Sequence, residues 1–479
     1  MSGTPALTIL DASRGAVITA QSPEYDEARS VYNAMIDRRP LAVVRAADVT
    51  DVRIAVDAAR ESGLPLAIRD GAHSVPGFGT VDDGIVLDLG AMKGIRIDPA
   101  RQVARVQGGC DWGDFDHAAH SFGLATTGGI ISTTGVAGLT LGGGIGYLAR
   151  AHGLSIDNLR SADVVLADGS FVTASATEHP DLFWALRGGG GNFGVVTELE
   201  FDLHPVDTIY GGPMFFELEV AAELFKTYGE WIAAAPRAMG AFPAFQIAPP
   251  LPFIPEDRVG EPLVLLVSCF NGSDEDAESL LNELRSVGTP VAEHVGRMPY
   301  PALNSAFDGL LPRGLQHYWK AAFLPELTDG VIEAHVAHGP RVPAMESTMH
   351  LYPIDGAVHD VAADATAFAY RDASFAPVIA GMWPDAADNE ANIQWVRDYH
   401  RALEPHTSEG GYINFMAEDD QGRIRANYGA NYDRLASIKH TYDPDNLFRI
   451  NQNIVPAAAR PGSGPASSSG SGASALAPA

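Results

Sequence analysis

The segment Arg69-Asp70-Gly71-Ala72-His73-Ser74, followed by Gly77, decides the fold of this chain. It comes directly after the apolar residues 66–68, which predict a strand, so these polar residues form a loop at the strand's end. Glycine in such a loop removes side-chain bulk and lets backbone N–H groups cradle an anion such as a pyrophosphate. Taken alone, a glycine-containing loop with one histidine is more often an ordinary turn. The segments that follow favour the functional interpretation.

A glycine-rich run at residues 128–147 is the second signal, with eight glycines in twenty positions. Glycine costs up to about 1 kcal/mol at each helical position, so this density excludes an amphipathic helix. A flexible linker would lack the Ile, Val and Leu residues found here. The run also lacks the acidic residue of a Rossmann fingerprint and the Gly-Lys-Ser/Thr of a Walker loop. We therefore expect an ordered backbone wrapped around an extended ligand.

A third glycine-rich segment and a set of C-terminal motifs complete the pattern. They are Arg187-Gly188-Gly189-Gly190-Gly191-Asn192-Phe193-Gly194, Tyr412-Ile413-Asn414-Phe415, Tyr442-Asp443-Pro444-Asp445-Asn446 and Asn451-Gln452-Asn453. In this order, the motifs resemble the covalent FAD oxidases of the vanillyl-alcohol-oxidase superfamily. Within it they are most similar to the berberine bridge enzyme-like branch, and there to the 6-hydroxy-D-nicotine oxidase type. The resemblance implies an α+β, two-domain PCMH-type FAD-binding fold, with an α+β substrate domain whose sheet covers the flavin.

The length of 479 residues exceeds a comfortable single core, which agrees with two domains. The resemblance implies an FAD-binding domain at residues 1–205, with its PCMH-type part at about 36–205, and a substrate-binding domain at 206–440. A return segment at 441–456 packs on the FAD domain, and the Ala/Pro/Gly/Ser-rich residues 457–479 are expected to form a disordered tail.

Local patterns predict the individual elements. Val52, Ala55, Val56 and Ala59 recur at helical spacing, and Gly63 is expected to end that helix. Further helices are expected at residues 111–122, 274–287, 385–403 and 430–440. Strands are expected at 41–45, 66–68, 85–89, 103–107, 195–203, 263–269 and 411–416, with a hairpin formed by 162–167 and 171–174.

Composition and charge limit the partners. The net charge of −28, from 32 basic and 60 acidic residues, argues against nucleic acid and anionic membranes, since both need a basic surface. No apolar run reaches the roughly 18 residues of a membrane span, and no signal peptide is evident, so we expect a cytoplasmic protein. The expected partners are a small-molecule substrate and dioxygen, with the chain a monomer or homodimer. No spacing of ligand residues predicts a metal.

His73 matches the histidine that the family links to the flavin 8α carbon, so the resemblance implies covalent FAD. Many relatives add a cysteine thioether, but here Ile131 stands at the cysteine position, and Leu139 stands where a histidine often contacts the flavin. We therefore expect one link, through His73 only, and a packing role for Cys110. The resemblance implies further cofactor contacts at Arg69, Asp70, Gly71, Ala72, Ser74, Gly77, Ser132, Thr133, Gly135, Gly138, Leu139, Gly143, Val195, Asn451 and Asn453.

The candidate catalytic residues are Tyr412, Asn414 and Lys320. On a strand at 411–416, alternation would place Tyr412 and Asn414 on one face, which the family turns toward the flavin. A tyrosinate there could act as a base once its pKa of about 10 is lowered, and Lys320 could assist as a nearby cation or direct contact. The alternative for Lys320 is a solvated surface residue. Tyr147 and His350 are lesser candidates.

The resulting hypothesis is an FAD-dependent oxidase that oxidises a small-molecule alcohol or amine with dioxygen and releases hydrogen peroxide. Alternatives within enzymes are a tailoring oxidase or cyclase of secondary metabolism, or a dehydrogenase that reacts poorly with dioxygen. An idle flavin-binding protein is the alternative outside enzymes, and the pair Tyr412 and Asn414 argues against it. The fold leaves the substrate open.

Overall fold

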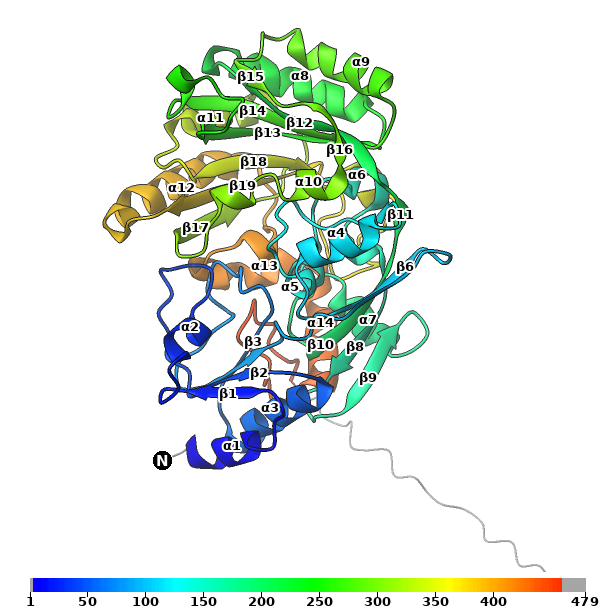
Figure 1. Cartoon of the computed structure of the whole chain (residues 1–479), viewed down its shortest axis with the longest axis vertical. Coiled ribbons are helices and arrows are strands. Elements are labelled where there is room, and N and C mark those ends of the chain that lie inside the picture. Colours follow the sequence, from blue (N-terminus) through cyan, green and yellow to red (C-terminus); the bar gives the residue numbers. More distant parts are fainter. Residues whose placement is uncertain (1–2, 459–479) are drawn as a thin grey trace, which may run out of the picture.

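The N-terminal part of the chain builds two small sheets in the computed structural model, which describes residues 3–458 (Figure 1). In the first sheet the order is β1 (Ala16–Thr19), β2 (Ala42–Arg45), β4 (Ile85–Asp88) and β3 (Leu66–Arg69), with β2, β4 and β3 parallel. Helix α3 (Val49–Ser62) crosses over from β2 to β3. Asp48 caps its start by accepting N–H bonds, and Gly63, at φ +65°, ends it. The expected helix and its apolar face are confirmed.

The second sheet is antiparallel and has five strands. Their order is β5 (Ile95–Asp98), β6 (Val103–Gln107), β10 (Val195–Asp202), β8 (Leu159–Val165) and β9 (Phe171–Ser175). The expected hairpin is the pair β8 and β9. Around the two sheets lie α1 (Gly3–Leu10), α2 (Tyr25–Arg29), α4 (Trp112–His120), α5 (Val136–Leu141), α6 (Ala149–His152), α7 (Pro180–Leu186) and the short pair β7 (Leu124–Ala125) and β11 (His204–Pro205).

A large antiparallel sheet forms the other part of the molecule. Its order is β15 (Ala292–Glu293), β12 (Thr208–Phe216), β14 (Pro262–Phe270), β13 (Met239–Ile247), β18 (Thr348–Pro353), β19 (Phe375–Trp383) and β17 (Gln316–Ala321), and β16 (Gly296–Pro299) also pairs with β12. One face is covered by α8 (Ala221–Ala234), α9 (Asp274–Arg285), α11 (Asp329–His338) and α12 (Asn389–Leu403). Alternation decides the faces: Met214 and Phe216 pack against the helices, whereas Phe215 packs on the opposite side. No helix within residues 3–458 is long and apolar enough to cross a bilayer.

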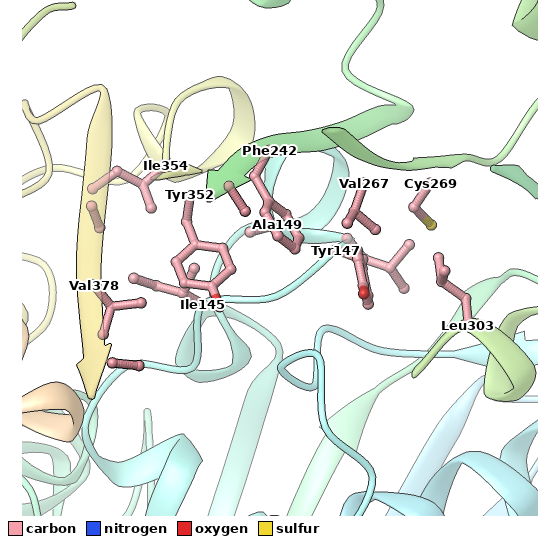
Figure 2. Close-up of a cluster of buried hydrophobic side chains, with 14 of the residues drawn as sticks. Ile145, Tyr147, Ala149, Phe242, Val267, Cys269, Leu303, Tyr352, Ile354 and Val378 are labelled. Carbon is pink, nitrogen blue, oxygen red and sulfur yellow. The ribbon is translucent and has the colours of Figure 1, made fainter. Parts of the chain in front are cut away.

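The opposite face of the large sheet packs on the N-terminal part. Figure 2 shows Ile145 and Tyr147, from the glycine-rich run, against Phe242, Val267 and Tyr352 of the sheet. Helix α10 (Tyr300–Asn304) adds a contact with α4. The expected α+β class, with a large sheet in the second part of the chain, is confirmed.

The C-terminal helices return to the N-terminal part of the molecule, where Figure 1 shows them in orange. Leu435 and Ile438 of α14 (Tyr432–Tyr442) share a core with Leu182 of α7, and Tyr428, at the end of α13 (Ile424–Tyr428), joins the same core. We therefore propose that the return begins at α13 rather than at residue 441. The expected tail lies outside the described residues from 459 onward.

The expected strand at 411–416 is wrong, because the chain forms a 3₁₀ turn at Ile413–Phe415. The N–H of Phe415 donates to the carbonyl of Tyr412 at 3.0 Å, which closes the turn. The N–H of Gly411 donates to the side chain of Asn427 rather than to a neighbouring strand. Of the apolar and aromatic residues that suggested a strand, Tyr412 and Met416 are buried and Ile413 and Phe415 partly buried by tertiary contacts instead.

Asp116 of α4 generates a prediction about pH. It is buried against α10, accepts a hydrogen bond from Asn304 Nδ2 at 2.6 Å, and burial raises its pKa from 3.8 to about 7. The folded state therefore holds this proton more tightly, and the stabilisation present below about pH 4 is lost as pH rises through about 7. We expect Asp116→Asn, which cannot ionise, to raise Tm at pH 8 by several degrees more than at pH 5, measured by circular dichroism.

The exposed control Asp257→Asn should leave the pH dependence of Tm as in the wild type. An equal change in Tm at both pH values for Asp116→Asn would contradict the assignment of this titration to Asp116.

Candidate functional site

A cavity of about 350 Å³ lies between the N-terminal part and the large sheet. Its floor is largely backbone, contributed by Gly79, Gly108, Gly129, Gly135, Gly138, Gly190, Gly191 and Gly194. Its roof is the sheet face opposite the helices, contributed by Gln246, Trp319, Thr348, His350, Tyr352, Val378, Ala380 and Met382. A volume in this range, with apolar walls and few polar groups, is typical of small-molecule sites.

The loop after β3 forms one end of the floor. The guanidinium of Arg69 is bound by Asp88 at 2.7 Å and by backbone carbonyls, so it holds the loop rather than reaching into the cavity. The carboxylate of Asp70 accepts the N–H of Gly138 at 3.3 Å, and burial raises its pKa to about 6. Gly135 has to be glycine, because a Cβ there would lie 2.2 Å from this carboxyl group.

His73 lies at the same end and is held on two sides. Its Nε2 is 3.2 Å from Thr133 Oγ1, and the ring of Tyr32 stacks on it with centroids 3.8 Å apart. Burial and the nearby positive charge of Arg313 lower its pKa from 6.5 to about 3, so its imidazole is neutral at physiological pH. The neutral ring has one nitrogen with a free lone pair, and the tautomer decides which of the two nitrogens it is.

Tyr412 stands against the glycine-rich run. Its hydroxyl oxygen accepts the N–H of Gly144 at 2.7 Å, and Asn414 Nδ2 donates to it at 2.9 Å. Asn414 also fits only because residue 142 is glycine, where a Cβ would lie 2.1 Å from its Oδ1. The donors favour the phenolate, but burial outweighs them and raises the pKa of Tyr412 to about 12. Because the donors occupy the oxygen, the hydroxyl hydrogen is left for an acceptor in the cavity.

The structure brings many of the expected residues together. Those that line the cavity are Arg69, Asp70, Ala72, His73, Ser74, Gly135, Gly138, Leu139, Tyr412, Asn414 and Asn451, with the lesser candidate His350. Those that do not line it are Gly71, Gly77, Ser132, Thr133, Gly143, Val195, Asn453 and Lys320, with the lesser candidate Tyr147.

The expectation for Lys320 has to be corrected. We expected it to assist at the site as a nearby cation or through a direct polar contact. It points to the helix side of β17, where its ammonium is bound by Asp419 at 2.8 Å and Asp420 at 2.6 Å. Its neighbour Trp319 lines the cavity instead, because successive side chains of a strand face opposite sides. Lys320 therefore has a structural ion pair, and the cavity receives no charge from it.

Other expected residues outside the wall have partners within the protein. The backbone N–H and the hydroxyl of Ser132 both donate to the carboxylate of Asp308, so neither is free to bind a cofactor. Val195 begins β10 and is buried beneath the floor. Gly77, at φ +74°, forms a turn with its N–H on the carbonyl of Ser74. Gly71 and Gly143 contact other protein segments rather than open space.

Apart from the lesser candidate His350, the polar residues of the roof were not predicted from the sequence. Thr348, His350 and Tyr352 alternate with the apolar Met349 and Leu351, which is a signal of a strand with one polar face. The neighbouring strand β19 is buried on both faces, so its sequence offers no comparable alternation.

The wall fits a cofactor with hydrogen-bond donors. Asn451 lines the cavity, and its amide donates to the carbonyls of Gly191 and Phe448, both at 3.0 Å. Its Oδ1 is buried and has no partner within residues 3–458, and the same is true of Asn453 Oδ1. Unpartnered buried acceptors and a glycine backbone floor suit the polar ring edge and diphosphate of FAD. Among the described residues no group of side chains could hold a metal ion.

Comparison with family models agrees with this site. A model described as "FAD binding domain" matches residues 40–175, and a model described as "Berberine and berberine like" matches residues 411–455. The first range contains most of the floor, and the second contains Tyr412, Asn414 and the returning segment with Asn451.

Known proteins are similar over nearly the whole chain. An FAD-linked oxidoreductase of Dictyostelium discoideum is 32% identical, covering 92% of this chain and 95% of that protein. (R)-6-hydroxynicotine oxidase of Paenarthrobacter nicotinovorans is 30% identical, covering 92% and 97%. The crystal structure of 6-hydroxy-D-nicotine oxidase from Arthrobacter nicotinovorans is 28% identical, with a TM-score of 0.83 over 95% of this chain and 99% of that one.

Proposed function

Because the chain belongs to the berberine bridge enzyme-like family of FAD-linked oxidoreductases, we propose that it is an oxidase of a small-molecule alcohol or amine, with dioxygen as acceptor. The observation that carries the proposal is the two-part cavity, with neutral His73 on a glycine floor and the buried hydroxyl of Tyr412 facing an aromatic roof.

The floor residues would hold FAD, with one covalent link through His73. A neutral imidazole has the lone pair that a bond to the flavin 8α carbon uses, and burial keeps His73 neutral. A second link needs a reactive thiol at the wall, but Ile131 lines the cavity there. Cys110 is buried outside the wall, and burial raises its pKa to about 12, so its thiol is unreactive.

Bound FAD supplies the electron acceptor, taking a hydride equivalent from the substrate and passing the electrons to dioxygen to give hydrogen peroxide. The apolar roof orients the substrate and excludes water from it. For Tyr412 to accept the substrate's hydroxyl proton, its own proton must first leave to solvent. Burial opposes this loss, whereas the N–H of Gly144 and the amide of Asn414 favour it by stabilising the phenolate.

The oxidase activity is tested on purified holoenzyme with a panel of small alcohols and amines. We expect at least one substrate to give hydrogen peroxide in a one-to-one ratio with substrate consumed. A substrate that reduces the flavin anaerobically, with no reoxidation by air, would instead indicate a dehydrogenase. Reduction by no member of a broad panel would argue for an idle flavin protein.

The single link predicts the fate of the flavin after acid precipitation. The wild-type pellet should stay yellow, and the His73→Ala protein should release nearly all its flavin into the supernatant, measured by absorbance. The control Cys110→Ala removes the other nearby nucleophile candidate and should keep the flavin in the pellet. Free flavin from the wild type would exclude the covalent bond.

The role of Tyr412 predicts the rate of flavin reduction. For an alcohol substrate, Tyr412→Phe should slow anaerobic reduction by roughly 10²–10⁴-fold, the usual contribution of general acid–base catalysis, with flavin content unchanged. For an amine that binds neutral, the loss should be much smaller, because no hydroxyl proton has to leave. Stopped-flow absorbance measures both rates.

The matched control is Tyr370→Phe, which removes a hydroxyl that donates to the carbonyl of Ala426 outside the cavity. Its reduction rate should equal that of the wild type. An unchanged rate in Tyr412→Phe with an alcohol would leave Tyr412 as a wall of the pocket only.

A further inference from the structure

The roof of the cavity carries one carboxylate that no protein group neutralises. Glu346 lies two residues before β18 and is half-buried at the cavity wall, and within residues 3–458 it has no hydrogen bond or ion pair. It lies in a turn closed by the N–H of Ser347 on the carbonyl of Ala344, directly before the strand whose residues Thr348, His350 and Tyr352 also line the cavity.

The charges around the cavity leave a negative wall. Apart from histidines, its charged side chains are Arg69, Asp70 and Glu346, and the guanidinium of Arg69 is neutralised by Asp88. Burial lowers the pKa of His350 to about 3, so this ring is neutral and forms a 2.6 Å hydrogen bond with Tyr352 through Nδ1. A carboxylate at a largely apolar wall is poorly solvated. Without a positive partner in the protein, it is stabilised most by a cationic ligand.

Glu346 is also far from the proposed reacting carbon. Tyr352 lies six positions further along the chain, and the strand from Thr348 to Tyr352 alone rises by about 13 Å. It marks the Tyr412 end of the cavity, since Phe415 packs against the rings of both Tyr352 and Tyr412, at 6.0 and 4.9 Å between centroids. Along β18, Glu346 therefore lies at the end opposite to Tyr352 and the Tyr412 side chain.

Apolar side chains line the wall between the two ends. Trp319 and Ala380 are paired across β17 and β19, and Ala380 is paired with Thr348 on β18, so these residues form one row across the roof. The hydroxyl of Thr348 is taken by the carbonyl of Phe245, so it adds little polarity. Val378 lies nearer the Tyr352 end, and Figure 2 shows it beside that tyrosine.

From this arrangement we propose that the substrate is an elongated, apolar molecule with a positively charged amine at the end remote from the oxidised carbon, and that Glu346 binds this charge. The proposal rests on the proposed oxidase function, since it assigns the Tyr412 end to the chemistry. Glu346 is a specificity-determining residue in this scheme and takes no part in proton transfer. The net charge of −28 acts in the same direction, by attracting cations to the protein.

The test compares three probes with one apolar body and different charges: 4-phenylbutylamine, 4-phenylbutanol and 4-phenylbutyrate. Their Kd values are measured by isothermal titration calorimetry on holoenzyme, in wild type, Glu346→Gln and the exposed control Glu326→Gln. We expect the wild type to bind the amine at least tenfold more tightly than the alcohol and the butyrate most weakly. In Glu346→Gln the amine and alcohol should bind about equally, with the alcohol unchanged, and Glu326→Gln should match the wild type.

Equal binding of amine and alcohol by the wild type, no detectable binding of the amine, or a preference that survives Glu346→Gln would each overturn the proposal. The titrations are run anaerobically, so no probe undergoes repeated turnover and the two proposals fail separately. Peroxide production with no preference for the charged probe removes only the role of Glu346. A charge preference in a protein whose flavin no substrate reduces removes only the oxidase function.

Discussion

A single buried ammonium, that of Lys439, holds together the segments on which the cavity depends. It donates to the carboxylate of Asp443 at 2.7 Å and to the carbonyls of Asn192 and Phe448 at 2.5 and 2.8 Å, with no exposed surface. Burial lowers the pKa of Lys439, so the charge persists only while its partners stay in place. These partners come from the third glycine-rich segment, the end of α14 and the returning chain. Loss of this contact would release Asn451 from the cavity floor.

A second constraint is the close approach of backbone segments. It gives the glycines a structural role besides contact with a ligand. Several were expected to face a ligand, yet Gly135 makes room for the carboxyl group of Asp70 and Gly142 makes room for Asn414. The glycine-rich run therefore lets protein groups reach the cavity as much as it lets a cofactor approach. In this way Tyr412, which lies far along the chain, accepts the N–H of Gly144, and Asn414 donates to the carbonyl of Leu139.

Desolvation sets the charges inside the cavity. It keeps His73 and His350 neutral, raises the pKa of Asp70 to about 6 and raises that of Tyr412 to about 12. In such a site, a bound cofactor and substrate bring the strongest charges and decide the protonation of their neighbours.

The sequence by itself determined the features that depend on neighbours along the chain. The periodicity of α3 with its stop at Gly63, the hairpin of β8 and β9, and the glycine loops with His73 were all readable, because propensity and turn chemistry act locally. Only the tertiary structure decided which polar groups already have hydrogen-bond or ion-pair partners within the protein. Lys320 is held by Asp419 and Asp420, Ser132 by Asp308, and Tyr412 sits in a turn instead of a strand. The partners of Lys320 and Ser132 lie 99 to 176 residues away, and Gly144, whose N–H Tyr412 accepts, lies 268 residues away. No local pattern encodes contacts across such separations.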